Sequence, residues 1–404
     1  MPWKKVLPME EKLAFIMKVK EENLDFAGVC RRFGVSRRTG YKWWRRYQAE
    51  GLLGLDERSH RPRSCPHAGA GVWTERLIEL RLRHPHWGPK KLRVKLVAAY
   101  GAAGVPAVST LGARLRAAGL VAWRRRRQWP RPWRERGDLS RATAANEVWG
   151  VDFKGWFRTG DGQRCDPLTI SDLYSRYVLC CRVAAEQSYA AVRPLFEAVF
   201  KAYGLPAVIR VDNGSPFAST GAGGLSRLSV WWVGLGIRTE FITPGHPEEN
   251  GVHERMHRTL KAETTKPPAG SRAGQQARFD EWRQEFNTER PHEALGQEVP
   301  AKRYQRSGRR YRAAMEPEYP GGYKVRRVRS NGQIKWGGGK RYVSEAMVGR
   351  LVGLCWAEPG RWEVWFGKYL LGDLYENEPG GLRPSVSVHQ ARQLKPKVLP
   401  ISPV

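Results

Sequence analysis

Residues 148–157 read VWGVDFKGWF, and this apolar run predicts a β-strand near the middle of the chain. One acidic residue, Asp152, lies inside it. Two more carboxylates occupy short stretches further on: Asp212 ends a strand-like segment in RVDNG (210–214), and Glu254 lies in GVHER (251–255). We take these three residues as the candidates for chemistry.

The elements around the three carboxylates predict a mixed α/β sheet. Their order is three strands, helix, strand, helix, strand, helix. The expected strands are 148–157, 167–172, 177–183, 207–211 and 239–242, and the expected helices are 188–203, 225–233 and 249–263. A sheet that brings the two aspartates together, with the last helix packed against it, would converge all three carboxylates.

Carboxylate oxygens are the ligands that hard divalent cations need, and Mg²⁺ is often held by one or two of them plus substrate phosphates. Two such ions about 4 Å apart would activate an attacking oxygen and stabilise a leaving one. Other carboxylates compete for this role. Glu248 and Glu249 precede the last helix and could cap it or favour its dipole. Asp172, in SDLYSR (171–176), is expected to organise a strand turn.

The charge of the chain indicates a polyanionic partner. Its 404 residues include 70 Lys and Arg against 39 Asp and Glu, a formal net charge of +31 with a pI of about 10.3. This balance is too basic for an ordinary metabolic enzyme. Residues 1–141 carry 32 of the basic and 12 of the acidic residues, so salt-sensitive phosphate contacts are expected mainly there.

Composition excludes several other classes of protein. Apolar residues make up 41 %, enough for real cores, so a wholly disordered basic protein is excluded. Mean hydropathy is −0.57, and no apolar run reaches the about 18 residues that a membrane span needs. Residues 1–20 lack the pattern of a secretory signal. The six cysteines are scattered without zinc-site spacing, which predicts reduced thiols in a cytosol and disfavours a structural zinc module.

Residues 1–60 predict a helix-turn-helix DNA-binding domain. Helices are expected over 10–22 and 25–33, followed by a Gly34 turn, with Ser36 as the N-cap of a third helix. A helix of this kind would enter a major groove. Its expected DNA-binding residues are Arg37, Arg38, Lys42, Arg45 and Arg46. The alternative is a three-helix bundle with a solvated basic face, and Gly40 lowers the helix propensity of the third segment.

A second helical module is expected over 72–123, with helices at 74–83, 90–100 and 109–118 and Ser109 as an N-cap. It could be a winged DNA-binding module or a helical spacer. Residues 124–141 follow as a basic linker that would lie along phosphates. Its expected DNA-binding residues are Arg124, Arg125, Arg126 and Arg127.

Residues 320–404 alternate strand-like stretches with glycine turns, including a good hairpin turn at Asn331-Gly332. This pattern predicts a small C-terminal β-barrel. It could bind DNA or a partner subunit, or act as a stabilising appendage.

The three acidic stretches together resemble the DDE transposase and retroviral-integrase superfamily, especially bacterial insertion-sequence transposases with an integrase-type core. Residues 149–153, 211–214 and 243–255 match its acidic motifs. A downstream signature is recognisable in Phe286-Asn287, Arg290-Pro291-His292, Leu295-Gly296 and Pro300. The resemblance covers residues 142–306. It implies an RNase H-like fold in which Asp152, Asp212 and Glu254 form the catalytic and metal-binding triad.

The resemblance also sorts the neighbouring residues. Glu254, rather than Glu248 or Glu249, occupies the superfamily position. Arg258 and Lys261 follow it on the same helical face and could clamp DNA phosphates or form a surface ion-pair face. The stretch 221–224 is expected to be an inserted surface loop. The His/Cys zinc module in front of retroviral integrases is absent, which favours a bacterial transposase.

What the resemblance implies is a transposase that binds the terminal inverted repeats of a mobile element. It would cut a DNA strand and transfer the freed 3′-hydroxyl to target DNA with two Mg²⁺ ions, for which Mn²⁺ would substitute. Double-stranded DNA and further copies of the chain, as a dimer or higher homo-oligomer, are the implied partners, together with possible accessory proteins encoded by the element. The implied location is the bacterial cytoplasm, at the nucleoid, with no membrane contact.

Two other functions fit the same sequence. One is a DNA-binding regulator that has kept an inactive integrase-like core. The other is a nuclease that cuts DNA but cannot join it.

Overall fold

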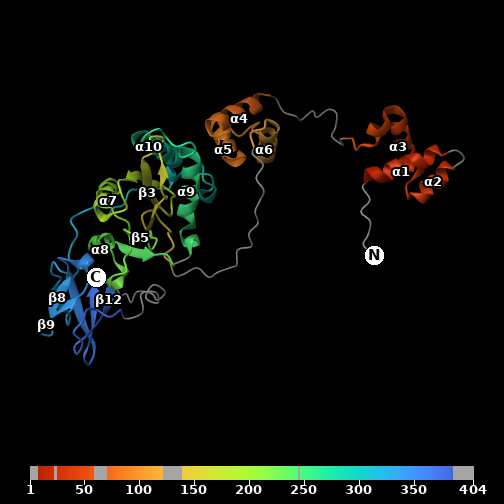
Figure 1. Cartoon of the computed structure of the whole chain (residues 1–404). Coiled ribbons are helices and arrows are strands. Elements are labelled where there is room, and N and C mark those ends of the chain that lie inside the picture. The colour runs from red at the N-terminus through yellow and green to blue at the C-terminus, as the bar shows by residue number, and fades with distance from the viewer. Residues whose placement is uncertain (1–7, 22–24, 59–70, 122–138, 244–245, 385–404) are drawn as a thin grey trace. The chain divides into compact units, whose positions relative to one another are not determined.

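The computed structural model describes residues 8–21, 25–58, 71–121, 139–243 and 246–384, and the chain forms two compact units, Met1–Ala70 and Gly71–Val404 (Figure 1). No helix in this described part is long and apolar enough to cross a membrane. Residues 124–138 of the predicted basic linker, including Arg124 to Arg127, lie outside the described residues, as does the end of the chain after residue 384.

The first unit is a three-helix domain, as predicted. Its helices are α1 (Pro8–Lys20), α2 (Phe26–Arg32) and α3 (Arg37–Glu50), followed by the 3-10 turn η1 (Gly51–Leu55). The Ser36 hydroxyl accepts a hydrogen bond from the Thr39 amide, so the predicted N-cap is confirmed. Close packing explains the glycine at position 40 of α3, because a Cβ there would lie 2.6 Å from Cys30 Sγ.

The second helical module contains α4 (Val72–Arg83), α5 (Pro89–Tyr100) and α6 (Val108–Ala117) around a core that includes the fully buried Leu77, Leu92 and Leu111. Residues 71–121 contain no strand, so the predicted wing is wrong for this part of the chain. The Ser109 cap is also wrong. Helix α6 starts one residue earlier, and its N-cap, Ala107, has no side-chain acceptor.

A six-stranded mixed sheet forms the centre of the second unit, which confirms the predicted α/β core. The strand order is β2-β3-β1-β5-β6, and β4 also pairs with β3. Strand β1 runs antiparallel to β3 and parallel to β5, which in turn runs parallel to β6. The strands are β1 (Val148–Phe153), β2 (Phe157–Arg158), β3 (Arg164–Asp172), β4 (Val178–Ala184), β5 (Val208–Val211) and β6 (Arg238–Phe241).

Helices cover both faces of this sheet (Figure 1). On one face α7 (Tyr189–Tyr203) and α8 (Arg227–Gly234) pack on apolar side chains of β1, β3 and β5. On the other, α9 (Gly251–Thr264) and α10 (Arg272–Thr288) pack on side chains of β3 and β4. The sequence did not predict α10, because only Phe279, Trp282 and Phe286 mark its apolar side in an otherwise polar segment. Short 3-10 turns lie at η2 (Ala222–Gly224), η3 (Pro247–Asn250), η4 (Glu293–Leu295), η5 (Pro300–Lys302) and η6 (Glu345–Met347).

The predicted C-terminal barrel is wrong for the described residues, where the strands form two open sheets. One sheet has the order β12-β11-β10-β7, and β8 pairs only with β9. Their apolar faces are covered without closure, because Ile334 of the hairpin and Leu225 and Val230 of the core share one cluster with them. The strands are β7 (Lys324–Arg327), β8 (Gln333–Trp336), β9 (Gly339–Tyr342), β10 (Leu351–Glu358), β11 (Arg361–Phe366) and β12 (Tyr369–Tyr375).

The stretch 221–224 lies at the surface, as expected, since none of its residues is buried, and it also packs against this C-terminal sheet. A Cβ on Gly223 would lie 3.2 Å from the Leu370 carbonyl oxygen and 3.3 Å from a Leu371 methyl carbon. The stretch therefore links the central α/β sheet domain to the C-terminal strands, although parts of it stay exposed to solvent.

The close packing at Gly40 generates a test. Gly40→Ala should lower the stability of the first unit by about 1–3 kcal/mol, because the new methyl group overpacks the Cys30 and Phe15 side chains. Hydrogen exchange of the α3 amides in the full chain measures the loss. Gln48→Ala, an exposed change on the same helix, is the matched control and should keep normal protection. Equal protection in both variants would show that the site has room for a side chain.

Candidate functional site

The parallel pairing of β1 and β5 brings the two candidate aspartates to one edge of the sheet. Val148 pairs with Val208 and Gly150 with Arg210, and this register carried two residues further sets Asp152 level with Asp212. Asp152 lies near the end of β1, and Asp212 directly follows β5. Because parallel strands end at the same edge, both carboxylates belong to one site.

Glu254 reaches the same site from α9, which begins at Gly251. His253 and His257 turn into the protein, and Glu254 stays exposed in the first turn of the helix. The pKa of Asp152 is raised to about 7, chiefly by burial and then by the charges of Asp212 and Glu254. The three predicted residues therefore share one electrostatic environment.

The three carboxylates do not form a finished coordination set. Among the described residues, no group of three or more His, Cys, Asp or Glu side chains lies closely enough to hold a metal ion. In the same part of the chain, neither Asp212 nor Glu254 forms an ion pair. Asp152 lies 3.6 Å from the His257 ring and also interacts with Lys154. A cluster of carboxylate oxygens of this kind fits a divalent ion by its chemistry.

A buried polar cluster that the sequence did not reveal holds Asp152 and α9 together. The Thr169 hydroxyl donates to the Asp152 carbonyl oxygen at 3.0 Å and lies 2.7 Å from His253 Nε2 and 2.6 Å from His257 Nε2. Ser171 Oγ lies 2.9 Å from His253 Nδ1. Thr169 is the partner of Asp152 in the β1–β3 register. The pairing of these two strands therefore positions Asp152 next to the hydroxyl that both histidines contact.

The hydrogen bonds of this cluster orient both histidine rings, and burial favours their neutral forms. A carbonyl oxygen only accepts, so the single Thr169 proton goes to Asp152, and both Nε2–H groups donate to Thr169. Burial lowers the pKa of His253 to about 3, and burial together with His253 and Lys154 holds the pKa of His257 far below its usual range. His257 Nδ1 therefore turns a lone pair toward Asp152 Oδ2, 3.6 Å away.

The competing carboxylates serve local structure. Glu249 accepts hydrogen bonds from the Thr243 amide at 2.6 Å and the Thr243 hydroxyl at 3.0 Å, which closes the turn before α9. Asp172 is fully buried and accepts from the amides of Asn146 and Ser175, so the prediction that it organises a strand turn is confirmed.

Basic residues surround the site, and one of them was not predicted. Lys154 lies close enough to interact with both Asp152 and Lys261, and burial and the Lys261 charge lower its pKa. Its position two residues after Asp152 was the signal available in the sequence. Arg258 and Lys261 are exposed on α9 and form no ion pair within the described residues, so a phosphate-binding role for them stays a prediction.

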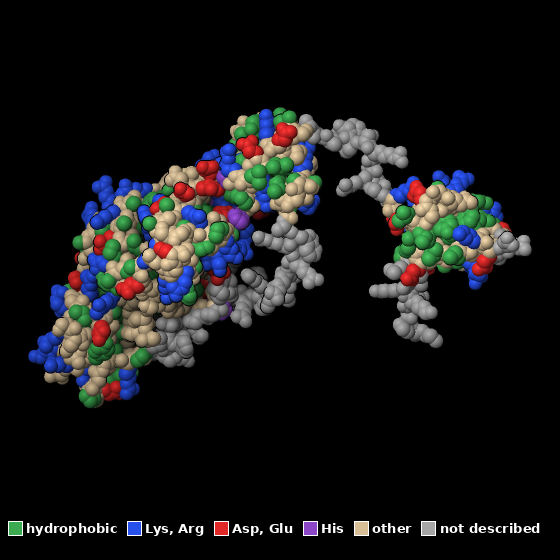
Figure 2. Space-filling model, turned by 45° about the horizontal axis from the view of Figure 1, so that its top comes forward, with side chains coloured by type: hydrophobic (Ala, Val, Ile, Leu, Met, Phe, Trp, Pro, Cys, Tyr) green, Lys and Arg blue, Asp and Glu red, His purple; other side chains and the backbone are tan. Residues whose placement is uncertain are grey.

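The predicted DNA-binding residues of α3 have accessible side chains. Arg37, Arg38 and Arg45 are exposed, whereas Lys42 and Arg46 also contact the buried Trp43 ring, at 4.6 and 5.0 Å from its centroid. On the visible face of the second unit, Lys and Arg side chains are widely spread with small groups of Asp and Glu among them (Figure 2).

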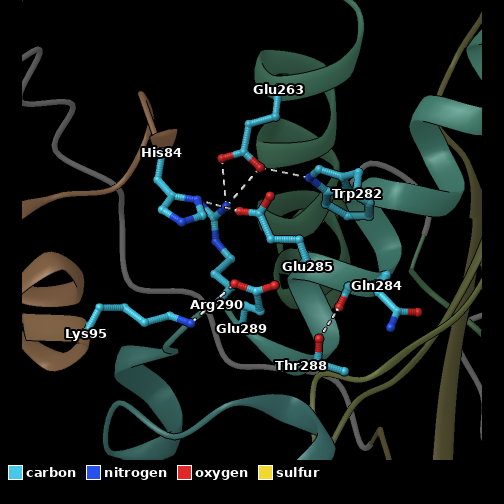
Figure 3. Close-up of polar contacts among 9 residues, drawn as sticks. All are labelled: His84, Lys95, Glu263, Trp282, Gln284, Glu285, Thr288, Glu289 and Arg290. Carbon is cyan, nitrogen blue, oxygen red and sulfur yellow. Dashed lines mark hydrogen bonds and ion pairs between the residues drawn. The ribbon is translucent and has the colours of Figure 1, made fainter. Parts of the chain in front are cut away.

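The end of α4 and the basic face of α5 contact the end of α10 and the chain after it. Lys95 pairs with Glu289 at 3.4 Å, and His84 Nδ1 lies 3.0 Å from Glu285 Oε1 (Figure 3). Lys90 pairs with Glu293. These lysines are therefore used within the chain.

Residues of the downstream signature support this junction. Arg290 is buried and donates to both oxygens of Glu263, at 2.6 and 2.8 Å, and Trp282 Nε1 donates to the same carboxylate (Figure 3). The Asn287 side chain bonds both the amide and the carbonyl of Val178, where β4 begins. Within the described residues, Arg290 and Asn287 therefore bond the end of α10 to α9 and to β4.

Comparison with known families agrees with this architecture. Models described as "Integrase core domain" match residues 142–247 and 235–300, a "Helix-turn-helix domain" matches 11–63, and a "Homeodomain-like domain" matches 39–115. An uncharacterized 39.2 kDa protein of insertion element IS476 from Xanthomonas euvesicatoria is 27% identical over 252 residues, covering 62% of this chain and 69% of that protein. Together these matches support a bacterial insertion-element transposase with an integrase-type core. The chain is thus a polynucleotidyl transferase of the DDE type.

Two further relatives extend the comparison. The transposase is 29% identical over 187 residues to an uncharacterized 31.7 kDa protein of insertion element IS407 from Burkholderia multivorans, covering 46% of this chain and 65% of that protein. The integrase catalytic core domain of HTLV-2 aligns with 41% of the transposase and 100% of its own chain, at 15% identity and a TM-score of 0.33.

The Thr169 cluster generates a second test. Thr169→Val should leave two buried Nε2–H groups without an acceptor and weaken the attachment of α9 by about 2 kcal/mol or more. Hydrogen exchange in α9 would then be about 30-fold faster. Thr259→Val is the matched control, since that hydroxyl bonds only the Arg255 carbonyl of its own helix. Unchanged protection of α9 in Thr169→Val would contradict the account of this cluster.

The ion pair beneath the α5 junction generates a third. Arg290→Met should lower the free energy of unfolding by about 3–5 kcal/mol, because Glu263 would remain buried without its partner. Urea denaturation measures the loss. Adding Glu263→Gln should recover part of it. A double variant no more stable than Arg290→Met would show that the packing of the arginine stem, not the charge pair, matters.

Proposed function

We propose that this transposase cuts a DNA strand at the end of a mobile element and joins the freed 3′-hydroxyl to target DNA. The observation that carries the proposal is the position of Asp152 and Asp212 at one sheet edge, with the Glu254 charge acting on Asp152, in a chain of the integrase-core family. Integrase-core enzymes generally use divalent metal ions, and the unpaired acidic residues here suit them.

The acidic residues of the site are proposed to bind the metal ions. Asp152, Asp212 and Glu254 would hold two Mg²⁺ ions, or Mn²⁺ in their place. Such ions activate the attacking oxygen and stabilise the leaving oxygen of a phosphoryl displacement. Since no coordination set is complete in the described residues, the exposed Glu254 is the side chain expected to swing inward. The hydrogen bond from the Thr169 hydroxyl to the Asp152 carbonyl keeps Asp152 in place while it does so.

The basic residues would position the DNA. Lys154 beside Asp152, with Arg258 and Lys261 on α9, would neutralise phosphates next to the bond that is cut. Arg37, Arg38, Lys42, Arg45 and Arg46 of α3, together with Arg124 to Arg127, would bind the terminal repeats of the element. Joining requires two ends to meet, so we propose a dimer or higher oligomer on DNA at the nucleoid.

A strand-transfer assay with labelled element ends and Mg²⁺ tests the proposal. Wild type should cut and join. Asp152→Asn, Asp212→Asn and Glu254→Gln should each lose about a hundredfold or more of both activities while keeping DNA binding, because each removes a metal-binding carboxylate. Glu281→Gln, an exposed change on α10, is the control and should keep full activity.

The other outcomes separate the alternatives. Cutting without joining would identify a nuclease. DNA binding with neither activity, in Mg²⁺ or Mn²⁺, would identify a regulator with an inactive core. Joining that survives Asp152→Asn would overturn the assignment of the triad.

A further inference from the structure

Trp156 is a large apolar side chain left in solvent next to the acidic site. It lies between β1 and β2, and 57% of the residue is exposed. Trp156 follows Asp152 by four positions, so the two Cα atoms are at most roughly 14 Å apart. Lys154, between them, interacts with Asp152. A DNA strand that reaches the carboxylates therefore passes within a few nucleotides of this indole.

The segment that carries Trp156 is anchored to the core on its other side. The next residue, Phe157, turns inward and packs edge-to-face on Phe279 of α10, with ring centroids 6.4 Å apart. The β2–β3 turn is bonded to the chain before α10, since the Gly160 amide donates to the Ala269 carbonyl and the Asp161 amide to the Gly270 carbonyl, each at 2.8 Å. The backbone that carries Trp156 is thus held in place by the core. Binding of a ligand to the indole would therefore cost this segment little conformational entropy.

Two arginines make cation-π contacts with the indole. The guanidinium carbons of Arg158 and Arg164 lie over the Trp156 ring, 5.9 and 5.2 Å from its centroid. Arg158 donates to the Gly162 carbonyl at 2.7 Å, and Arg164 pairs with the buried Asp166 at 3.2 Å. With Lys154, they place positive charge next to the part of this indole that stays exposed to solvent, and positive charge complements phosphate.

The ligand that fits an exposed aromatic surface next to positive charge is a nucleotide. Bases stack on aromatic side chains regardless of sequence, and arginines beside them neutralise the backbone. A base inside a duplex offers only its edges, so the face must come from a base that is unpaired or lies at the end of a helix. The DNA end proposed as the substrate supplies such a base.

We infer that Trp156 is a stacking platform for an unpaired or terminal nucleobase of the DNA end held at the acidic site, with Arg158 and Arg164 beside the attached phosphates. This inference rests on the proposed function and adds a contact that positions the substrate strand. Trp156 is a positioning residue, because it contacts the DNA without taking part in the reaction at the phosphate.

A double-mutant cycle between the protein and the DNA tests the inference. The probe is an element-end duplex whose last nucleotide is unpaired and carries a dideoxy 3′ terminus so that it cannot be joined. Its partner has an abasic site at that nucleotide. Fluorescence anisotropy in Mg²⁺ measures the affinity of the full-length protein for each. Wild type should bind the probe with the base about tenfold more tightly. Trp156→Ala should bind both probes as weakly as wild type binds the abasic one.

Three variants serve as controls. Trp156→Phe keeps an aromatic face and should retain part of the preference, whereas Trp156→Leu keeps apolar bulk and should lose it. Trp356→Ala removes an equally exposed tryptophan, also 57% exposed, from the C-terminal sheet and should leave the preference intact. If Trp156→Ala weakened both probes equally, or neither, the inference would be overturned.

The result is distinguishable from a failure of the proposed function. If wild type cuts and joins DNA but shows no preference for the base, only the stacking inference fails. If the preference is present and depends on Trp156 while no joining occurs, the stacking stands and the proposed joining fails.

Discussion

The second unit depends on one constraint, which is that carboxylates must be kept close together in a partly buried place. The parallel pairing of β1 with β5 sets Asp152 level with Asp212, and the docking of α9 adds Glu254. Burial and the like charges of Asp212 and Glu254 both oppose ionisation of Asp152, and they raise its pKa. The packing of the sheet, the Thr169 cluster and the helices holds the carboxylates in place against this repulsion. A bound cation would neutralise it.

Packing behind the site explains why the helices tolerate so many buried polar groups. His253 and His257 are buried but find their partner in Thr169, a residue of the strand next to Asp152. A second polar centre, Arg290 with Glu263 and Trp282, ties α10 to α9 further along. Lys95 of α5 forms an ion pair with Glu289 at the end of α10. The helical module and the acidic site are therefore both attached to the α9–α10 pair.

Much of the fold could be predicted because local signals were strong. The apolar run 148–153, the Ser36 cap and the alternation of strands and helices after residue 188 all reflect short-range physics. Contacts between distant segments could not be predicted. The polarity of α10 hid its helix, and the coverage of the C-terminal sheet by Leu225 and Val230, which makes barrel closure unnecessary, is a tertiary effect. In the site, the three acidic residues carried recognisable local motifs, whereas Thr169 carried none.

Diffraction from crystals of the transposase soaked in Mn²⁺ tests the central claim most directly, since the anomalous signal locates the ions independently of any activity. The account predicts Mn²⁺ bound by oxygens of both Asp152 and Asp212, with Glu254 drawn in to join them. Mn²⁺ bound elsewhere, with these three carboxylates still apart, would contradict it.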